Sequence, residues 1–405
     1  MKILIITQYY PPEVGAAAER MAGMARFLAE RVHVTVLAPI PSYPWGVILR
    51  DDYKQWSWHE TDGVTVLRTY KYPIRRTFLL RLMGEIQYTL FTLIRALCLP
   101  KPDLVIITSP SFFLGIVGLV LKFIRKVDYV FDVRDHYPDS VRDTGALESH
   151  FIYDRLKGLE RTFYRQARIV SIAHEVWRRE IEAAARQVVT VPNGVDLERF
   201  NSVPGRQVGQ LPPDRLDFLE SHFIVLYLGN MGELHDIMTF LQVAQRIEEH
   251  GATDIQFVFL GAGAQKADLM AWVQQAGVTN CHFWDPIPGY GVPAVIKRSR
   301  VGIVGMGPHV KSMMGCVPVK VFEYLAGNLD IIGCLQGDLP AHLTECSQFF
   351  NFHNRDVDGL SSISLALWKA GKKSKTPEDL LKIISREKHY QVLWKAIRPA
   401  VAERV

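Results

Sequence analysis

Short runs of apolar, often β-branched residues alternate with longer stretches of helical periodicity along most of the chain. Apolar runs without polar alternation are typical of strands that are buried on both faces of a parallel sheet. The expected strands are Lys2–Thr7, Val32–Leu37, Leu104–Thr108, Tyr129–Val133, Ile169–Ile172, Ile224–Leu228, Ile255–Leu260, Val301–Val304 and Leu329–Ile332. The expected helices are 17–30, 78–97, 111–125, 148–166, 174–185, 233–250, 264–275 and 318–327. This strand–helix–strand repetition predicts an α/β fold with helices on both faces of parallel sheets.

The alternation is interrupted once, at 201–221, where proline, glycine and polar residues predominate as in a linker. We therefore expect two doubly wound, Rossmann-like domains, 1–200 and 201–385, and a C-terminal helix at 386–405 that packs back, with the N-terminal domain as the favoured partner. Ligands of open α/β sheets bind beyond the carboxyl ends of the strands. The cleft between two such domains is the expected site.

Composition narrows the class of protein further. The 405 residues are 48% hydrophobic and 22% charged, which excludes a disordered chain, a collagen-like repeat and a disulfide scaffold. The five cysteines are scattered without a C-x-x-C pair, so we expect free thiols in a reducing cytoplasm. No signal peptide is recognised, and the longest apolar run, Phe112–Leu121, is too short to span a membrane.

The net charge of +5 is concentrated in one segment, which changes its interpretation. Residues 71–126 hold nine basic residues against two acidic ones, so the rest of the chain is faintly acidic. The same segment carries apolar stripes, which either belong to the core or form a basic, partly apolar surface that contacts anionic lipid headgroups. The candidate acceptor or membrane residues are Arg75, Arg76, Arg81, Lys122, Arg125 and Lys126.

Glycine-rich turns follow the first strand of each predicted domain. Gly15 and Ala16 open a helix with small side chains, so its backbone N–H groups could meet a phosphate or a sugar hydroxyl; a plain turn is the alternative. The second domain repeats this arrangement at Gly229, Asn230, Gly232 and His235, and again at Gly261. None of these three turns completes G-x-G-x-x-G, which argues against a dinucleotide-dependent dehydrogenase.

Two groups of ionisable residues stand near strand or helix ends. Arg134, Asp135 and His136 directly follow an apolar strand, where catalytic groups gather, although a solvated ion pair would give the same sequence. Lys320 and Glu323 share one face near the start of a helix at Pro318. The ammonium could meet a diphosphate and the carboxylate the two hydroxyls of a ribose, or the two could form a surface ion pair.

The order of these motifs resembles the retaining glycosyltransferases of family 4, which have the GT-B fold. The series is the Gly15 turn, V-P-N-G-V-D at 191–196, Y-L-G-N-M-G at 227–232, F-L-G-A-G at 259–263 and P-V-K-V-F-E-Y-L-A at 318–326. It covers roughly residues 1–350. The segments 41–44 and 133–138, together with the motif of Lys320 and Glu323, resemble the branch that adds amino- or deoxy-sugars in bacterial O-antigen, capsule or exopolysaccharide assembly.

The resemblance implies a UDP-sugar donor, a lipid-linked glycan acceptor, no nucleic acid and no metal. The protein would then be peripheral on the inner face of the cytoplasmic membrane. The resemblance places Glu323 on the ribose. It also places the glycines at 15, 229, 232 and 261, together with Ala16 and Asn230, near the donor. Lys320, then His235, would stabilise the leaving diphosphate. Asp135, Arg134, His136 and Lys320 would be the catalytic residues.

The chain also departs from the family pattern at several positions. Gly315 stands where the first of two spaced glutamates is usual, and Asn230 and His235 lie near the usual arginine and lysine of the donor loop. Arg134 replaces a common histidine. Two further functions therefore stay open: a UDP-sugar epimerase on the same fold, and a catalytically silent GT-B binding subunit.

Overall fold

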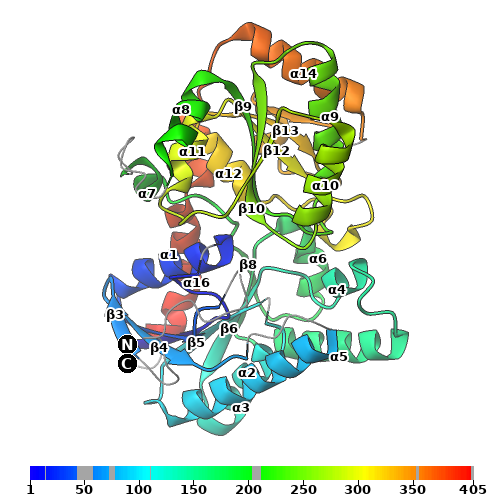
Figure 1. Ribbon diagram of the computed structural model, residues 1–405. Helices are drawn as coiled ribbons and strands as arrows, with labels where there is room; N and C mark the ends of the chain where they lie inside the picture. Colours follow the sequence, from blue (N-terminus) through cyan, green and yellow to red (C-terminus); the bar gives the residue numbers. More distant parts are fainter. Residues whose placement is uncertain are drawn as a thin grey trace. The chain divides into compact units, whose positions relative to one another are not determined.

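The computed structural model describes residues 1–13, 15–42, 58–72, 78–109, 111–202, 211–352 and 355–402. The chain forms two compact units, Met1–Pro192 with Arg386–Val405 and Asn193–Ser385. Figure 1 shows both units as sheets flanked by helices. Within the described ranges, no helix is long and apolar enough to cross a membrane. The five cysteines are free thiols.

The first unit is built on an eight-stranded sheet in the order β3-β4-β2-β1-β5-β6-β7-β8. Its strands are β1 (Lys2–Ile6), β2 (His33–Pro39), β3 (Trp58–Thr61), β4 (Val64–Thr69), β5 (Leu104–Thr108), β6 (Asp128–Val133), β7 (Ile169–Ile172) and β8 (Val188–Thr190). All pairs are parallel except β3 with β4. The strands β3, β4 and β8 were not expected from the sequence, because a short hairpin and a three-residue edge strand lack a long apolar run.

Helices cover this sheet, and the last one belongs to the same unit. They are α1 (Ala16–Ala29), α2 (Phe78–Cys98), α3 (Leu114–Arg125), α4 (Asp139–Asp143), α5 (His150–Gln166), the 3-10 turn η1 (Glu175–Trp177), α6 (Arg178–Glu182) and α16 (Arg386–Ala402). The single helix expected at 174–185 is thus two short pieces. The helix α16 packs on α1, where the Tyr390 hydroxyl donates to the Arg20 carbonyl at 2.7 Å.

The second unit contains a six-stranded parallel sheet in the order β11-β10-β9-β12-β13-β14. The strands are β9 (Phe223–Asn230), β10 (Ile255–Ala262), β11 (Cys281–Trp284), β12 (Val301–Gly305), β13 (Asp330–Cys334) and β14 (Phe349–Asn351). Its helices are α7 (Leu197–Ser202), α8 (Pro213–Ser221), α9 (Met238–Glu249), α10 (Lys266–Ala276), α11 (Val292–Arg298), η2 (Lys311–Met313), α12 (Val319–Ala326), α13 (Ala341–Thr344), α14 (Val357–Ala370) and α15 (Glu378–Ile384). The expected linker at 201–221 was wrong for 213–221, which form α8.

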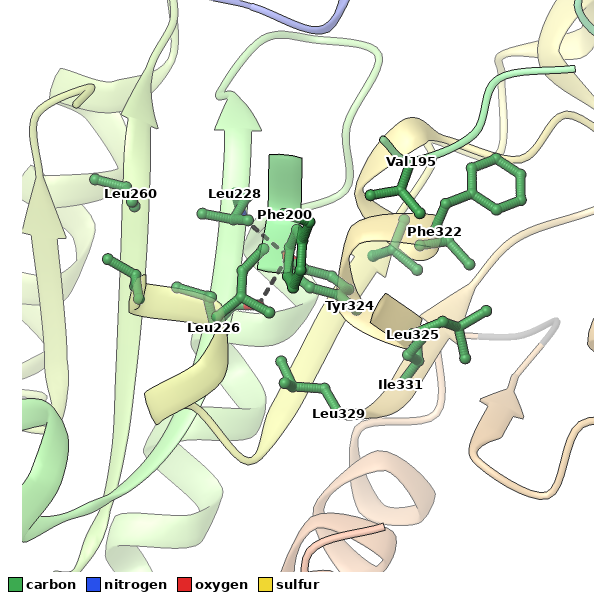
Figure 2. Packing of buried hydrophobic residues seen from close by; sticks show 14 of the residues in the cluster. Val195, Phe200, Leu226, Leu228, Leu260, Phe322, Tyr324, Leu325, Leu329 and Ile331 are labelled. Atoms are coloured by element: carbon green, nitrogen blue, oxygen red, sulfur yellow. Dashed lines mark hydrogen bonds between the residues drawn. The ribbon is translucent and has the colours of Figure 1, made fainter. Parts of the chain in front are cut away.

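A tyrosine of α12 joins this helix to the sheet of the second unit by hydrogen bonds, in addition to the apolar packing of the helix. The Tyr324 hydroxyl donates to the Leu226 carbonyl and accepts from the Leu228 N–H, both at 3.0 Å, as Figure 2 shows. Its ring occupies the space above Gly302 of β12, where an added Cβ would lie 2.3 Å from the ring. Because a buried N–H needs a partner, Tyr324 sets the position of α12 against β9.

Candidate functional site

The ends of β9 and β10 form one side of the candidate site in the second unit. Gly229 and Asn230 are exposed, and Gly229 has a φ of +110°, which favours glycine. Gly261 lies opposite Gly229 in the ladder, and a Cβ on it would lie 1.9 Å from the Gly229 carbonyl oxygen. A Cβ on Gly263 would similarly meet the backbone of Met231 at 2.3 Å. The close approach of the two strand ends therefore explains Gly261 without any ligand.

Lys320 reaches this strand end from α12. Its residue is 8% exposed, and its Nζ has no hydrogen-bond partner among the described residues. The Nζ lies 3.8 Å from the centre of the Tyr227 ring and would lie 3.8 Å from a Cβ on Gly229. Burial lowers the pKa of Lys320 to about 7, although nearby Glu323 opposes the shift. An unpaired, buried ammonium at a strand end is not the surface ion pair that the sequence allowed, and it fits an anion.

His235 lies beside this lysine. Burial and the charge of Lys320 lower the pKa of His235 to about 3, so its imidazole is neutral at physiological pH. Its Nδ1 is buried without a hydrogen-bond partner in the described part of the chain. A neutral imidazole can donate a hydrogen bond but supplies no positive charge. Lys320 is therefore the better candidate of the two for a diphosphate.

In the first unit, the turn after β1 leads into α1 as expected. Gly15 is the residue that precedes the first helical turn, no side chain caps it, and Ala16 is exposed. The Gly15 carbonyl accepts from the Glu19 N–H at 3.1 Å, which closes the first turn. The N-terminus of α1 therefore presents small side chains, as a sugar- or phosphate-facing turn would require.

The turn after β6 holds Arg134 and Asp135 at the carboxyl edge of the first sheet. Ser109, which follows the neighbouring strand β5, accepts from the backbone N–H groups of Arg134 at 2.8 Å and Asp135 at 3.3 Å. Burial raises the pKa of Asp135, and the neighbouring Arg134 opposes the shift. Both side chains are partly exposed. The serine fixes the backbone from which both candidate catalytic groups project.

A buried ion pair lies directly behind these residues. Arg20 of α1 donates to Asp132 at 3.2 Å and to the carbonyl oxygens of Val191 and Pro192. Asp132 also accepts from Ser171 at 2.7 Å. These contacts join α1, β6, β7 and the end of β8 into one support for the carboxyl edge of the sheet.

His136 faces away from the pair that precedes it. Its imidazole lies 3.6–3.8 Å from carboxylate oxygens of Asp139, Glu160 and Glu180, and it stacks on the Trp177 ring. The sequence grouped His136 with Arg134 and Asp135, but the structure places its side chain, 5% exposed, among helices α4 to α6.

The comparisons with known proteins bear on both units. Residues 15–194 match the family described as "Glycosyl transferase 4-like domain". The chain is 28% identical over 318 residues to the putative colanic acid biosynthesis glycosyl transferase WcaI of Escherichia coli (strain K12), covering 75% of this chain and 76% of the relative. It is 25% identical over 200 residues to a 2-deoxystreptamine glucosyltransferase of Streptomyces kanamyceticus, covering 48% and 51%. Over residues 15–194 the chain is thus similar to the family 4 glycosyltransferases, and over three quarters of its length it is similar to WcaI.

Solved structures confirm the GT-B fold that the resemblance implied. The sucrose-phosphate synthase of Thermosynechococcus elongatus has a TM-score of 0.67 at 16% identity, covering 100% of this chain and 98% of the other. An α,α-trehalose 6-phosphate synthase of Burkholderia multivorans has a TM-score of 0.71 at 12% identity, covering 100% of both chains. Anabaena HepE, solved with UDP and glucose, has a TM-score of 0.64 at 13% identity, covering 98% and 100%.

The basic residues of segment 71–126 have mixed surroundings in this glycosyltransferase. Arg75 and Arg76 lie outside the described residues, as do residues 43 and 44 of one motif and the side chain of Arg81. Lys122 donates to the Gln166 carbonyl, and Arg125 donates to the carbonyls of Ala96 and Leu99, which caps the end of α2. Lys126 is exposed. The Phe112–Leu121 run is mostly core, with Phe112, Leu114, Val117 and Leu121 buried.

Several residues at the two sheet edges were not expected from the sequence to lie near a site. The ring of Tyr227 lies under the ammonium of Lys320. The two residues are far apart in sequence, so only the packing of α12 against β9 reveals the contact. His174 follows β7 as Asp135 follows β6, and burial with Arg20 and Arg134 lowers its pKa to about 3. Its position directly after a strand was the available signal.

The D-x-D at 356–358 is a helix cap, since Asp356 accepts from the Gly359 N–H at 3.0 Å.

Proposed function

We propose that this glycosyltransferase is retaining and moves a sugar from a UDP-sugar, of the amino- or deoxy-sugar class, to a lipid-linked or other glycan acceptor in bacterial surface polysaccharide assembly. The name of the Escherichia coli relative, with its reference to colanic acid, supports the polysaccharide assignment. The HepE structure with UDP and glucose supports the nucleotide. The second unit would bind the donor and the first the acceptor.

The observation that carries this proposal is the buried, unpartnered Nζ of Lys320. When the bond between the sugar C1 and the UDP oxygen breaks, negative charge develops on the β-phosphate. A cation that is already in place, in a site with little water, stabilises that charge without reorganisation. Lys320 would meet the diphosphate, Glu323 of the same helix the ribose hydroxyls, and the backbone at Gly229, Asn230 and Gly232 would lie beside the phosphates.

In the first unit, Arg134 and Asp135 would face the reacting groups. The acceptor hydroxyl oxygen forms the new bond to C1 while the bond from C1 to the UDP oxygen breaks. Its proton passes to the departing phosphate on the same face of the sugar, which retains the configuration. Asp135 would orient the acceptor hydroxyl, and no protein base of high pKa is needed. His136 would act only through the turn that it anchors.

Release of UDP from a panel of UDP-sugars, with and without a polyprenyl-diphosphate glycan, tests the assignment. We expect release from at least one donor, faster with acceptor, and a loss of at least tenfold in Lys320→Met. The matched control is Lys369→Met, which removes an exposed lysine of α14 in the same unit. Absence of UDP release across the panel would contradict transfer. UDP binding without turnover would then favour the silent subunit, and interconversion of UDP-sugars the epimerase.

We also propose that the first unit rests on an anionic membrane through α2 and α3. The two helices pack together, and five apolar side chains form one stripe along α2: Met83, Ile86, Leu90, Ile94 and Leu97 are 37–56% exposed. Phe123 and Ile124 at the end of α3 are 56% and 69% exposed. Lys122, Arg125 and Lys126 lie at the same end of α3. An apolar stripe next to cations matches the chemistry of an acidic lipid surface.

Flotation with liposomes of anionic or neutral lipids tests this contact. We expect binding to anionic liposomes at low salt, its loss at high salt, and a severalfold weaker binding of Leu90→Ser/Ile124→Ser. Met270→Ser, which changes a side chain 47% exposed in the second unit, is the control. Equal binding of the double variant and the wild type would reject α2 and α3 as the contact.

A further inference from the structure

A charged cluster beneath the turn after β6 has no part in the donor site. It joins His136 of that turn, Asp139 of α4, Lys157 and Glu160 of α5, and Glu180 of α6. One ligand atom from each of the histidine and the three carboxylates lies within 4.8 Å of all the others. Such a spacing is close to that of ligands around one divalent cation, whose bonds are about 2.0–2.6 Å long.

The centre of this cluster is taken by the ammonium of Lys157. Its Nζ lies 2.9 Å from Asp139 Oδ2, 2.8 Å from Glu160 Oε2 and 2.8 Å from Glu180 Oε1. An ammonium has three donors, so each of its protons has one carboxylate acceptor. Distances of 2.8–2.9 Å fit charge-assisted hydrogen bonds and exceed metal–oxygen bonds.

The imidazole of His136 completes the cluster without a hydrogen bond of its own at Nε2. That atom is buried and has no hydrogen-bond partner among the described residues, although it lies 3.8 Å from Glu160 and 3.7 Å from Glu180. The residue is 5% exposed, and its ring stacks on Trp177 at 5.7 Å between centroids. The Nε2 atom of His136 therefore points toward the carboxylates as a metal ligand would, and it has no hydrogen bond to Lys157.

Two of the three carboxylates are themselves held in position. Tyr153 donates to Asp139 and Tyr164 donates to Glu160, both at 2.7 Å. Burial alone would lower the pKa of Lys157, but its three carboxylate partners raise it above its ordinary value. The lysine therefore stays charged, and it is the only lysine or arginine that the described salt bridges place on these three carboxylates.

We propose that Lys157 takes the place of a structural metal ion: its ammonium ties α4, α5 and α6 together beside His136, and the cluster becomes a divalent-cation site when that ammonium is removed. Because Asp135 precedes His136 in the chain, Lys157 is also a positioning residue for the turn that carries Arg134 and Asp135. This last consequence rests on the function proposed above.

Removal of the ammonium gives a test that does not depend on catalysis. In Lys157→Ala, we expect the melting temperature to fall by roughly 10 °C, because three carboxylates lose their cation. Saturating Zn²⁺ should restore at least half of that loss, with one ion bound per chain in calorimetry. His136→Ala in the Lys157→Ala background should abolish the rescue. The wild type and Lys101→Ala, an exposed lysine of the same unit, should show neither the loss nor the rescue.

The positioning consequence is read separately. In Lys157→Ala, UDP affinity should be unchanged, while turnover falls and recovers in part when Zn²⁺ is added. If the wild type itself shows no turnover, the proposed function fails, but the effect of Zn²⁺ on the melting temperature still tests the metal site. If Lys157→Ala does not fold, the double variant Lys157→Ala/Glu180→Gln is used instead. The second change removes the charge of Glu180, the most exposed of the three carboxylates, which has lost its cation. Zn²⁺ binding by the wild type at this cluster, or failure of Zn²⁺ to stabilise or to recover folded protein for both variants, would overturn the proposal.

Discussion

The Nζ atom of Lys320 lies 3.8 Å from the centre of the Tyr227 ring. The face of a phenol ring attracts a cation and offsets part of the hydration that burial removes. The offset is incomplete, because the pKa of Lys320 falls to about 7. The ammonium is thus held above β9 in a state that an incoming diphosphate would stabilise.

Binding of UDP should become weaker as the pH rises above 7. The diphosphate favours the protonated lysine, so above its pKa each binding event must take up a proton. Between pH 7 and 9 we expect the affinity to fall on the order of 50-fold, because the protonated fraction of a group with a pKa of about 7 falls by that factor. Calorimetry in two buffers of different ionisation enthalpy measures the proton uptake. Lys320→Met should bind more weakly at pH 7 and without proton uptake, and identical uptake in the variant would exclude Lys320 as the source.

Replacement of Lys320 should also reveal the cost of its burial. Its folded pKa of about 7 lies below its value of 10.5 in the unfolded chain, so the unfolded state binds more protons between these two values. The free energy of unfolding of the wild type, relative to Lys320→Met, should therefore rise with pH from 7 to 10. We expect the variant to be more stable at pH 6 by about 1–3 kcal/mol. Parallel urea titrations at four pH values measure this; a constant difference would mean that the ammonium is solvated.

Tyr324→Phe should destabilise the second unit. The change leaves the buried Leu228 N–H without its acceptor and removes the donor to the Leu226 carbonyl. We expect a loss of about 1–3 kcal/mol and weaker UDP binding, because α12 carries Lys320. Tyr290→Phe, at a tyrosine 45% exposed in the same unit, is the control. Unfolding by urea gives the first quantity and calorimetry the second. Unchanged stability would show that water replaces the hydroxyl.

Glu323→Gln should weaken the binding of UDP by about tenfold, in keeping with the loss of a charged hydrogen bond. The same change should have much less effect on the binding of 2′-deoxy-UDP, because that nucleotide lacks the ribose hydroxyl that donates a hydrogen bond to the carboxylate. The four affinities form a double-mutant cycle. Equal losses for the two nucleotides would place Glu323 away from the 2′-hydroxyl.

Asp135→Asn should reduce turnover by about 100-fold or more while UDP affinity stays unchanged. The substitution keeps the shape of the side chain and removes its charge. Burial raises the pKa of this carboxyl, so the acidic limb of the wild-type pH profile should lie above the ordinary range of an aspartate. Steady-state kinetics from pH 4.5 to 8 measure both. If turnover survives, Asp135 serves only the backbone that Ser109 holds.

The sequence predicts the long central strands well, and it predicts the short edge elements and α8 poorly. Lys2–Ile6, Ile255–Ala262 and Val301–Gly305 are long apolar runs, so burial on both faces of a sheet leaves a clear pattern. The hairpin β3–β4 is stabilised by pairing at the sheet edge, which leaves a weak local signal. The helix α8 begins at the second of two consecutive prolines that resemble a linker, because the missing N–H of Pro213 costs nothing at the first position of a helix.

The sequence by itself indicated the resemblance to the family 4 glycosyltransferases, the two parallel sheets and the positions of the chemistry-bearing residues, because strand burial and the order of motifs are properties of the chain. Only the tertiary structure decided what each side chain meets. Lys320 and Tyr227 are distant in sequence and contact because Tyr324 fixes α12 to β9. His136 follows Asp135 directly, yet its imidazole meets carboxylates from three helices around the Lys157 ammonium. Desolvation and charge pairing arise from such packing, and they decide which of these groups is free to bind an anion.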